Sequence, residues 1–409
     1  MKQERIAILT DLDPMSNAGA NLVGFQYAMA AQRDFEIEFW TSVCVDADLK
    51  PQNSYENIEI RRFLHSKRFG DFPKKGIKAK TIRELFSPLP IIWITQQIKR
   101  FKPQLIWVHQ IGNVFPLTSF LVCRILKIPA LFTLHDFGVL VPRKLFPKDL
   151  NLENVDLSPF ALGVNFPPVK LKLQNGSHSK FYLFRYSIIR LILSSVYLIS
   201  ISSLQHQILT ANKLNLFAKI ENGVGRCNCD AEQITRLDAI LFAGRLNGKG
   251  LEHAVETVAK SKGLSLHLAG GQELFEIAKR KMESERITYH GQLSHAEVCL
   301  LLHQVKFTSV MSDCFDVYPS ILLEALAHGS APICYPTAGN ANLAHEIDRS
   351  LVVKFGENID DVNLDRLNSD AKLSSKVFEV GKTLKSFDKA SEEYYGLIKR
   401  ILKSKEQNF

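Results

Sequence analysis

Short apolar runs that end in small or polar residues recur along both halves of the chain. They occupy residues 6–10, 105–109, 130–134, 239–243, 264–269, 307–311, 331–335 and 351–355. Continuous apolar runs of this length are typical of strands buried on both faces of a parallel sheet. The pattern therefore predicts eight buried strands.

Helical patterns alternate with these runs at residues 21–32, 251–260, 274–284, 295–302 and 319–328. Repeated strand–helix alternation favours doubly wound α/β domains with parallel sheets. The alternation occurs twice, and a chain of 409 residues with 46% hydrophobic residues exceeds what one core usually holds. We predict two such domains, residues 1–205 and 206–387.

The sequence also predicts the domain boundary, the place of the C-terminal helix and an insertion in the first domain. The boundary is placed where the apolar residues 188–201 give way to a polar stretch through residue 230. Residues 388–409 space Tyr395, Ile398 and Leu402 on one helical face, so this helix is expected to pack back on the first domain. Residues 137–187 interrupt the alternation and predict a long insertion or lid.

The net charge of +9 is unevenly distributed. Residues 51–200 hold 22 Lys and Arg against 8 Asp and Glu, whereas the rest of the chain holds 29 against 34. With no paired C-x-x-C spacing and no RNP-like aromatic string, this pattern argues against nucleic-acid binding. The cation clusters at 61–62, 67–68, 74–80 and 99–100 lie near phenylalanines, which fits an anionic membrane surface; a solvated basic face fits as well.

We expect neither an export signal nor a membrane span. The first apolar core is four residues long and is followed by Asp11 and Asp13, and the longest apolar stretch, 191–201, is about half of the ~20 residues that span a bilayer. Seven cysteines, an odd number, favour reduced thiols, and the pair Cys227 and Cys229 lacks further ligands at metal-binding spacing. We expect a cytoplasmic protein that is peripheral at the inner face of the membrane if its basic face docks there.

The first candidate site follows the predicted strand 239–243. Residues 244–250 place Arg245 and Lys249 among Gly244, Gly248 and Gly250 at the entry to a helix. Glycines allow close backbone approach, and helix N–H groups and cations attract phosphate, so a diphosphate site is favoured. The order is not that of a Walker A loop, and a glycine-rich turn with two solvated cations is the alternative.

The second candidate site is residues 316–329. Pro319 suits the first turn of a helix, which places Glu324 among leucine and alanine residues, where a carboxylate needs a partner. A ribose diol, which donates two hydrogen bonds, suits that carboxylate, and Asp316 in the preceding loop would face a sugar hydroxyl. The alternative is an ordinary helix with one surface glutamate.

The first domain offers histidines at two strand ends. His109 and His135, the latter followed by Asp136, each come directly after a predicted strand. A lone histidine there is more often structural, but two at equivalent strand ends favour a shared site. Residues 17–20 form a small-residue turn in which Gly19 lets a substrate approach the backbone, although a plain tight turn explains it as well.

In this order and spacing, the motifs resemble retaining glycosyltransferases of the GT-B fold, in glycosyltransferase family 4, also called group 1. The resemblance covers most of the chain and is carried by residues 221–224, 242–250, 268–271, 289–291 and 316–329, and by 133–137 with Pro142 and Arg143. It implies an α/β protein of two Rossmann-like domains that face each other across a cleft. The first would be the acceptor-side domain and the second the nucleotide-sugar donor domain.

The resemblance also implies roles for single residues. Arg245 and Lys249 would hold the donor diphosphate and stabilise the leaving nucleotide without a metal or cofactor, and Glu324 would bind the ribose. Asp316 would contact the transferred sugar, and His135 would lie beside it at the reaction centre. Further donor contacts would be Gly19 and Gly244, and the acceptor-side residues would be His109 and Asp136.

The chain departs from the family pattern at three places. Asp316 stands where glutamate is common, and residues 17–20 and 338–340 stand where glycine pairs are usual. These departures leave open an altered substrate choice or a degenerate enzyme. We expect sugar transfer from a nucleotide diphosphate sugar to a surface-polysaccharide or lipid-linked acceptor; the alternatives are a non-catalytic glycan-binding or partner subunit and a sugar-nucleotide epimerase.

Overall fold

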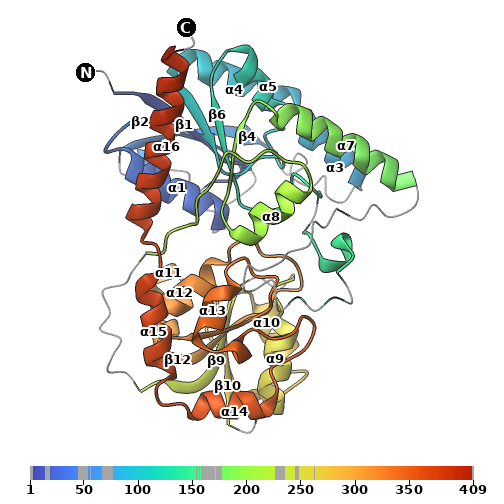
Figure 1. Ribbon diagram of the computed structural model, residues 1–409, viewed down its shortest axis with the longest axis vertical. Coiled ribbons are helices and arrows are strands. Elements are labelled where there is room, and N and C mark those ends of the chain that lie inside the picture. The colour runs from blue at the N-terminus through green and yellow to red at the C-terminus, as the bar shows by residue number, and fades with distance from the viewer. Residues whose placement is uncertain are drawn as a thin grey trace.

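The computed structural model describes residues 3–13, 19–44, 54–55, 57–66, 77–142, 144–152, 155, 157, 171, 177–225, 235–244, 248–261 and 263–407. These residues form two α/β domains stacked along the long axis of the molecule, each built on one sheet (Figure 1). The predicted fold class, two parallel-sheet domains facing each other, is confirmed.

The first sheet has the strand order β3-β4-β2-β1-β5-β6-β7-β8, with every neighbouring pair parallel except β3 and β4. One face is covered by α3, α4, α5 and α7 and the other by α1 and α16. Helix α8 follows β7 and lies toward the second domain (Figure 1). The bounds are β1 (Arg5–Leu9), α1 (Gly19–Ala31), β2 (Glu36–Cys44), β3 (Ser54–Tyr55), β4 (Ile58–His65), α3 (Ile77–Leu85), α4 (Pro88–Phe101), β5 (Leu105–Val108), α5 (Ser119–Ile125), β6 (Ala130–Leu134), α7 (Ser177–Leu193), β7 (Tyr197–Ser200), α8 (Ser203–Ala211), β8 (Ala218–Lys219) and α16 (Phe387–Gln407).

The second sheet has the order β11-β10-β9-β12-β13 and is parallel throughout. Four of its strands, β9, β10, β12 and β13, lie close to predicted apolar runs, because most of their residues are buried on both faces. Strand β11, in which Thr288 is exposed, was not predicted. The bounds are β9 (Leu237–Ala243), α9 (Leu251–Lys260), β10 (Ser265–Ala269), α10 (Gln272–Ala278), β11 (Ile287–Tyr289), α11 (His295–Gln304), β12 (Val305–Val310), α12 (Ser320–Ala327), β13 (Ala331–Cys334), α13 (Ala341–Ile347), α14 (Asp361–Ser369) and α15 (Leu373–Thr383).

Residues 351–355 do not form the strand predicted there. A 3₁₀ turn ends at Leu351, Val352 makes one isolated bridge to Cys334, and the Val353 N–H donates to the Cys334 carbonyl at 2.9 Å. Leu351, Val352 and Val353 are nevertheless buried. The apolar run therefore reflects burial of an irregular segment, which a run of this length does not distinguish from a strand.

The chain passes from one domain to the other twice, and the two connecting segments are hydrogen-bonded to each other. The Val224 N–H donates to the Lys385 carbonyl at 3.0 Å, and the Phe387 N–H donates to the Val224 carbonyl at 3.2 Å. The predicted division after residue 205 falls inside α8, whereas β8 extends the first sheet to Lys219 before the first crossing.

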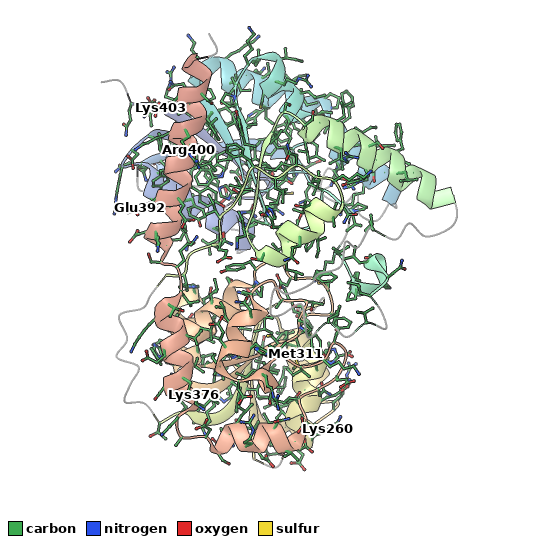
Figure 2. All side chains as sticks on the ribbon, viewed as in Figure 1. Lys260, Met311, Lys376, Glu392, Arg400 and Lys403 are labelled. Carbon is green, nitrogen blue, oxygen red and sulfur yellow. The ribbon has the colours of Figure 1, made fainter. Side chains whose placement is uncertain are left out.

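The last helix, α16, returns to the first domain and packs beside α1 (Figure 1). Tyr394 packs against Tyr27 of α1, with ring centroids 4.8 Å apart, while Glu392, Arg400 and Lys403 lie on the outer side of the helix (Figure 2). Since α16 follows the second domain in sequence and packs into the first, it ties the two together.

The described part of the segment predicted as an insertion or lid is packed against both domains. The Phe315 N–H of the second domain donates to the Leu145 carbonyl at 2.8 Å, and the rings of Phe137 and Phe315 meet edge to face. Leu140 and Val141 are buried in the core of the first domain. In the described ranges no helix is long and apolar enough to cross a bilayer.

Candidate active site in the interdomain cleft

A cleft of about 320 Å³ lies where the carboxyl ends of the two sheets face each other, and residues of both domains line it. Ligands of parallel sheets bind at this edge, outside the ends of the strands. Five of the residues predicted from the sequence lie in its lining: Gly19, His135, Lys249, Asp316 and Glu324. The structure therefore brings residues far apart in sequence to one site.

The glycine-rich loop after β9 forms one side of the site. Gly250, the N-cap residue directly before α9, has φ +77°, and a β-carbon there would lie 1.8 Å from the Met311 carbonyl oxygen, so only glycine fits. This contact fixes the loop against the end of β12, where Met311 lies inside the second domain (Figure 2). Gly244 has φ +155° and lies outside the cleft lining, and Arg245 lies outside the described residues.

Two lysines approach this loop from different domains. Lys249 makes an ion pair with Asp316, and both side chains are partly exposed to the cleft. Lys144, which the sequence analysis did not single out, comes from the first domain; a β-carbon at Gly248 would lie 2.8 Å from its ammonium nitrogen. Cations from both domains therefore lie near the loop predicted to hold a diphosphate.

The backbone of Asp316 is held by the loop after β13. Its N–H donates to the Thr337 carbonyl at 3.0 Å, and its carbonyl accepts from the Gly339 N–H at 2.8 Å. The departure at residues 338–340 thus lies directly behind Asp316. It keeps a glycine where contact is closest, since a β-carbon at Gly339 would lie 1.7 Å from the Val317 carbonyl oxygen.

Glu324 has a partner that the sequence analysis missed. The Nε2 atom of His295 lies 3.4 Å from its Oε1 atom, and the exposed fractions of the two side chains are 55% and 16%. His295 is the first residue of α11, whose start is fixed by reciprocal hydrogen bonds between Ser294 and Glu297. The hydrogen bond to the Glu324 carboxylate raises the pKa of His295 above its usual value, so its charge is favoured beside a carboxylate that faces the cleft.

The only sequence signal for His295 was its place in a predicted helix, directly after a serine suited to cap it. Nothing in the local sequence connects it to Glu324, which follows on the next helix. The pair forms because α11 and α12 pack against each other beside the cleft.

The two histidines of the first domain contact each other, with His109 Nδ1 and His135 Nε2 2.9 Å apart. His135 faces the cleft, whereas His109 is 1% exposed and stacks near Tyr27 and Trp107. Burial lowers the pKa of His135 to about 4 and that of His109 well below its usual value, so both rings are neutral at neutral pH.

The structure does not place the two predicted acceptor-side residues in the lining of the cleft. His109 is buried behind His135 and contacts its ring, which can orient the His135 imidazole. Asp136 is outside the cleft lining, and its carboxylate accepts the Gly138 N–H at 2.7 Å, which fixes the turn after β6.

The arrangement combines a neutral imidazole from the first domain with a lysine and two carboxylates from the second. Such a site suits a polyhydroxy ligand that carries an anionic group, because carboxylates accept from hydroxyls and the lysine attracts phosphate. In the part of the chain that the structure describes, no group of three or more His, Cys, Asp or Glu side chains is placed to hold a metal ion.

Two Rossmann-like domains with a ligand cleft between their strand ends form the GT-B fold. Residues 232–376 match the family model described as glycosyl transferases group 1. The chain is a glycosyltransferase, and this part of it is a group 1 glycosyl transferase domain. A comparison of the sequence with curated proteins finds no match.

Solved structures agree with this fold over nearly the whole chain. Sucrose-phosphate synthase from Thermosynechococcus elongatus has 16% identity and a TM-score of 0.69, with 98% of this chain and 100% of that chain covered. HepE from Anabaena, in complex with UDP-glucose, has 13% identity and a TM-score of 0.66, with 98% and 100% covered. WaaG, a glycosyltransferase involved in lipopolysaccharide biosynthesis, has 12% identity and a TM-score of 0.61, with 96% and 99% covered. At these identities the likeness establishes the fold.

Proposed function

We propose that the chain transfers a sugar from a nucleotide diphosphate sugar, with retention of anomeric configuration, to a surface-polysaccharide or lipid-linked acceptor at the inner face of a membrane. One observation carries the proposal: Lys249, Asp316 and Glu324 share a cleft with Gly19 and His135. The group 1 match and the binding of UDP-glucose by HepE support a nucleotide sugar as donor.

Within this proposal each residue has a defined task. Glu324 accepts hydrogen bonds from the ribose diol, while Lys249, with Arg245, attracts the diphosphate. Since Lys249 pairs with Asp316 in the structure, the diphosphate has to share or replace this partner. The carboxylate of Asp316 then becomes available to a hydroxyl of the transferred sugar.

The acceptor hydroxyl attacks the anomeric carbon on the face from which the diphosphate leaves. The bond between that carbon and the phosphate oxygen breaks, the new glycosidic bond forms, and the leaving phosphate takes the hydroxyl proton. His135 is neutral and offers the sugar a hydrogen bond rather than a charge. Positioning and electrostatic stabilisation of the departing phosphate then supply most of the rate.

The test measures release of nucleoside diphosphate from a panel of donors, after a thermal-shift screen has found the donor that stabilises the protein. We expect Glu324→Ala to lower kcat/KM by roughly 10- to 100-fold, because the loss of a hydrogen bond to a charged group costs about 1.5–3 kcal/mol. Glu379→Ala, at an exposed glutamate of α15, is the matched control and keeps full activity.

Equal activity of Glu324→Ala and wild type would refute the role of Glu324. Donor binding without turnover on any acceptor would favour a non-catalytic binding subunit, and conversion of the donor sugar without acceptor would favour an epimerase. We also propose that transfer needs no metal ion or cofactor, so wild-type activity persists in excess EDTA.

A further inference from the structure

Three arginines of the basic clusters predicted to face a membrane pair with carboxylates within the fold. Arg62 donates to Asp13 at 2.6 Å, with both side chains buried, and Arg100 donates to Glu38 at 2.9 Å. Arg61 pairs with Glu59 on the same strand. These three arginines are therefore poor candidates for contact with an anionic surface, and the clusters at 67–68 and 74–75 lie outside the described residues.

Another stretch of the first domain contains basic residues but no acidic ones. Residues 157–220 contain seven Lys and Arg and no Asp or Glu. The described part of this stretch forms α7, β7, α8 and β8 at one side of the first sheet (Figure 1). Within the stretch, Arg185 pairs with Glu84 and Lys219 pairs with Glu221, both from outside it, which leaves Arg190 and Lys213 as described cations that can attract a polyanion.

The outer face of α7 is apolar as well as basic. Leu183, Phe184 and Leu191 have exposed fractions of 49%, 62% and 67%, and Arg190 is exposed beside Leu191. Positions i, i+1, i+7 and i+8 fall on one side of a helix, so these residues form a stripe. The opposite side buries Arg185, Ile189 and Ile192 in the domain.

Helix α5 extends the apolar surface. It packs against α7, and Ile125 and Leu126 at its end have exposed fractions of 77% and 39%. Because α5 leads into β6 and α7 leads into the neighbouring β7, the two helix ends lie at the same edge of the sheet. Contiguous exposed apolar side chains on a soluble domain mark an interaction surface.

A cavity of about 390 Å³ opens at the end of this stripe. Its apolar lining includes the buried Leu193, Leu198 and Leu214, and its two cations are Arg190 and Lys213. None of the residues that line it is acidic. The cavity therefore combines an apolar interior with positive charge, which matches an anionic amphiphile.

The fold holds Lys213 at this cavity in an unfavourable backbone conformation. Its φ is +61°, which costs a non-glycine residue roughly 1–2 kcal/mol. The turn is closed by the Lys213 N–H, which donates to the Thr210 carbonyl at 2.8 Å, and by the Tyr186 hydroxyl of α7, which donates to the Asn212 carbonyl. Lys213 is thus fixed beside α7 and Arg190.

We propose that the outer face of α7 and this cavity dock the enzyme on an anionic phospholipid bilayer. Arg190 and Lys213 hold a headgroup phosphate, and Leu183, Phe184 and Leu191 enter the acyl region. This deepens the proposed function, which places the acceptor at a membrane, by naming the surface that brings the enzyme there.

The test is co-sedimentation of the full chain with vesicles of phosphatidylcholine, with and without phosphatidylglycerol, at low and high salt. Each cation close to an anionic surface raises binding roughly fivefold, so Arg190→Gln with Lys213→Gln lowers the partition coefficient about 30-fold on anionic vesicles. The charge-matched control is Lys260→Gln with Arg280→Gln, two exposed cations of the second domain (Lys260 in Figure 2), and it binds like wild type.

A second pair of variants tests the apolar stripe. Phe184→Ser with Leu191→Ser loses binding to anionic vesicles, whereas Leu300→Ser with Val362→Ser, at exposed positions of the second domain, does not. Donor turnover measured without vesicles stays at the wild-type value in all four double variants. That readout separates failure of the docking surface from failure of the proposed transferase.

Several outcomes would overturn the proposal. The proposal is contradicted if wild type does not bind anionic vesicles, or if it binds neutral vesicles equally well. Equal binding of the Arg190/Lys213 variant and its control also contradicts it. Thermal stabilisation by inorganic phosphate that disappears in this variant, without any vesicle binding, would assign the cavity to a soluble anion instead.

Discussion

Gly339 occupies a space that no side chain fits, and Gly339→Ala tests whether the loop it supports positions the donor site. A β-carbon there would lie 1.7 Å from the Val317 carbonyl oxygen and 2.7 Å from Ser202 Oγ of the first domain. Contacts of a real β-carbon below about 3.0 Å are essentially never seen, so Val317 and Gly339 have to separate by about 1.3 Å.

This displacement moves the backbone that positions both carboxylates of the site, Asp316 and Glu324. Val317 directly follows Asp316, whose carbonyl accepts the Gly339 N–H, and it precedes α12, which carries Glu324. A misplacement of about 1 Å in a positioning group lowers a catalysed rate about 10²-fold. We therefore expect kcat/KM for the donor to fall roughly 100-fold, equivalent to about 2.7 kcal/mol of transition-state stabilisation.

Initial rates of nucleoside diphosphate release measure this effect, and urea unfolding measures the accompanying loss of stability. Gly396→Ala makes the same chemical change in α16, where nothing lies within 4 Å of the new carbon. It keeps full activity, and its free energy of unfolding rises by about 0.5–1 kcal/mol, because alanine is favoured over glycine in a helix.

A Gly339→Ala protein that unfolds like wild type and keeps kcat/KM within about threefold would refute the reasoning. Adding Ser202→Gly to Gly339→Ala separates the two clashes. It recovers little activity, because the Val317 carbonyl is the nearer atom. Full recovery would instead place the constraint at the contact between the domains.

Two further predictions concern charged pairs. Glu324 raises the pKa of His295 above its usual value. The protonated His295 ring that holds Glu324 is present below that pKa and lost above it. The KM for the donor therefore rises as the pH increases through the pKa of His295. His295→Gln makes the KM profile flat across this range, and a flat wild-type profile would count against the role of the pair. Arg185→Met lowers the free energy of unfolding by about 3–5 kcal/mol, because it leaves the Glu84 carboxylate buried without its ion-pair partner. The double variant with Glu84→Gln recovers most of this loss in urea unfolding, and an equally unstable double variant would contradict the explanation.

The fold was predictable where burial alone determines the sequence pattern. Strand β5 and residues 239–243 of β9 are apolar throughout, and β6 is nearly so, because both of their faces are covered. Strands β2 and β4 were missed because Glu38 and Arg62 interrupt their patterns. Those charges are tolerated because Arg100 and Asp13, distant in sequence, pair with them. A local pattern cannot show such a partner.

The same distinction applies to the site. Lys249, Asp316 and Glu324 were identifiable because each follows a strand of one domain, at the edge where parallel sheets bind ligands. Lys144 and His295 were not, because their relevance depends on packing: Lys144 reaches the loop from the other domain, and His295 meets Glu324 through the neighbouring helix. The enclosure of His109 was equally invisible, since it results from the packing of α1 and α16 on the first sheet.

The charge distribution shows why a count along the chain is a poor guide to an anionic partner. Residues 51–200 carry the excess of cations, yet Arg62, Arg100 and Arg185 each pair with a carboxylate that the fold brings to them. Such pairs organise the interior of the first domain and contribute nothing to attraction at its surface. What attracts an anion is a cation whose surroundings lack carboxylates, and Arg190 and Lys213 meet this condition at the cavity beside α7. A carboxylate-free stretch, more than a dense basic cluster, is therefore the basis for the docking surface proposed for α7.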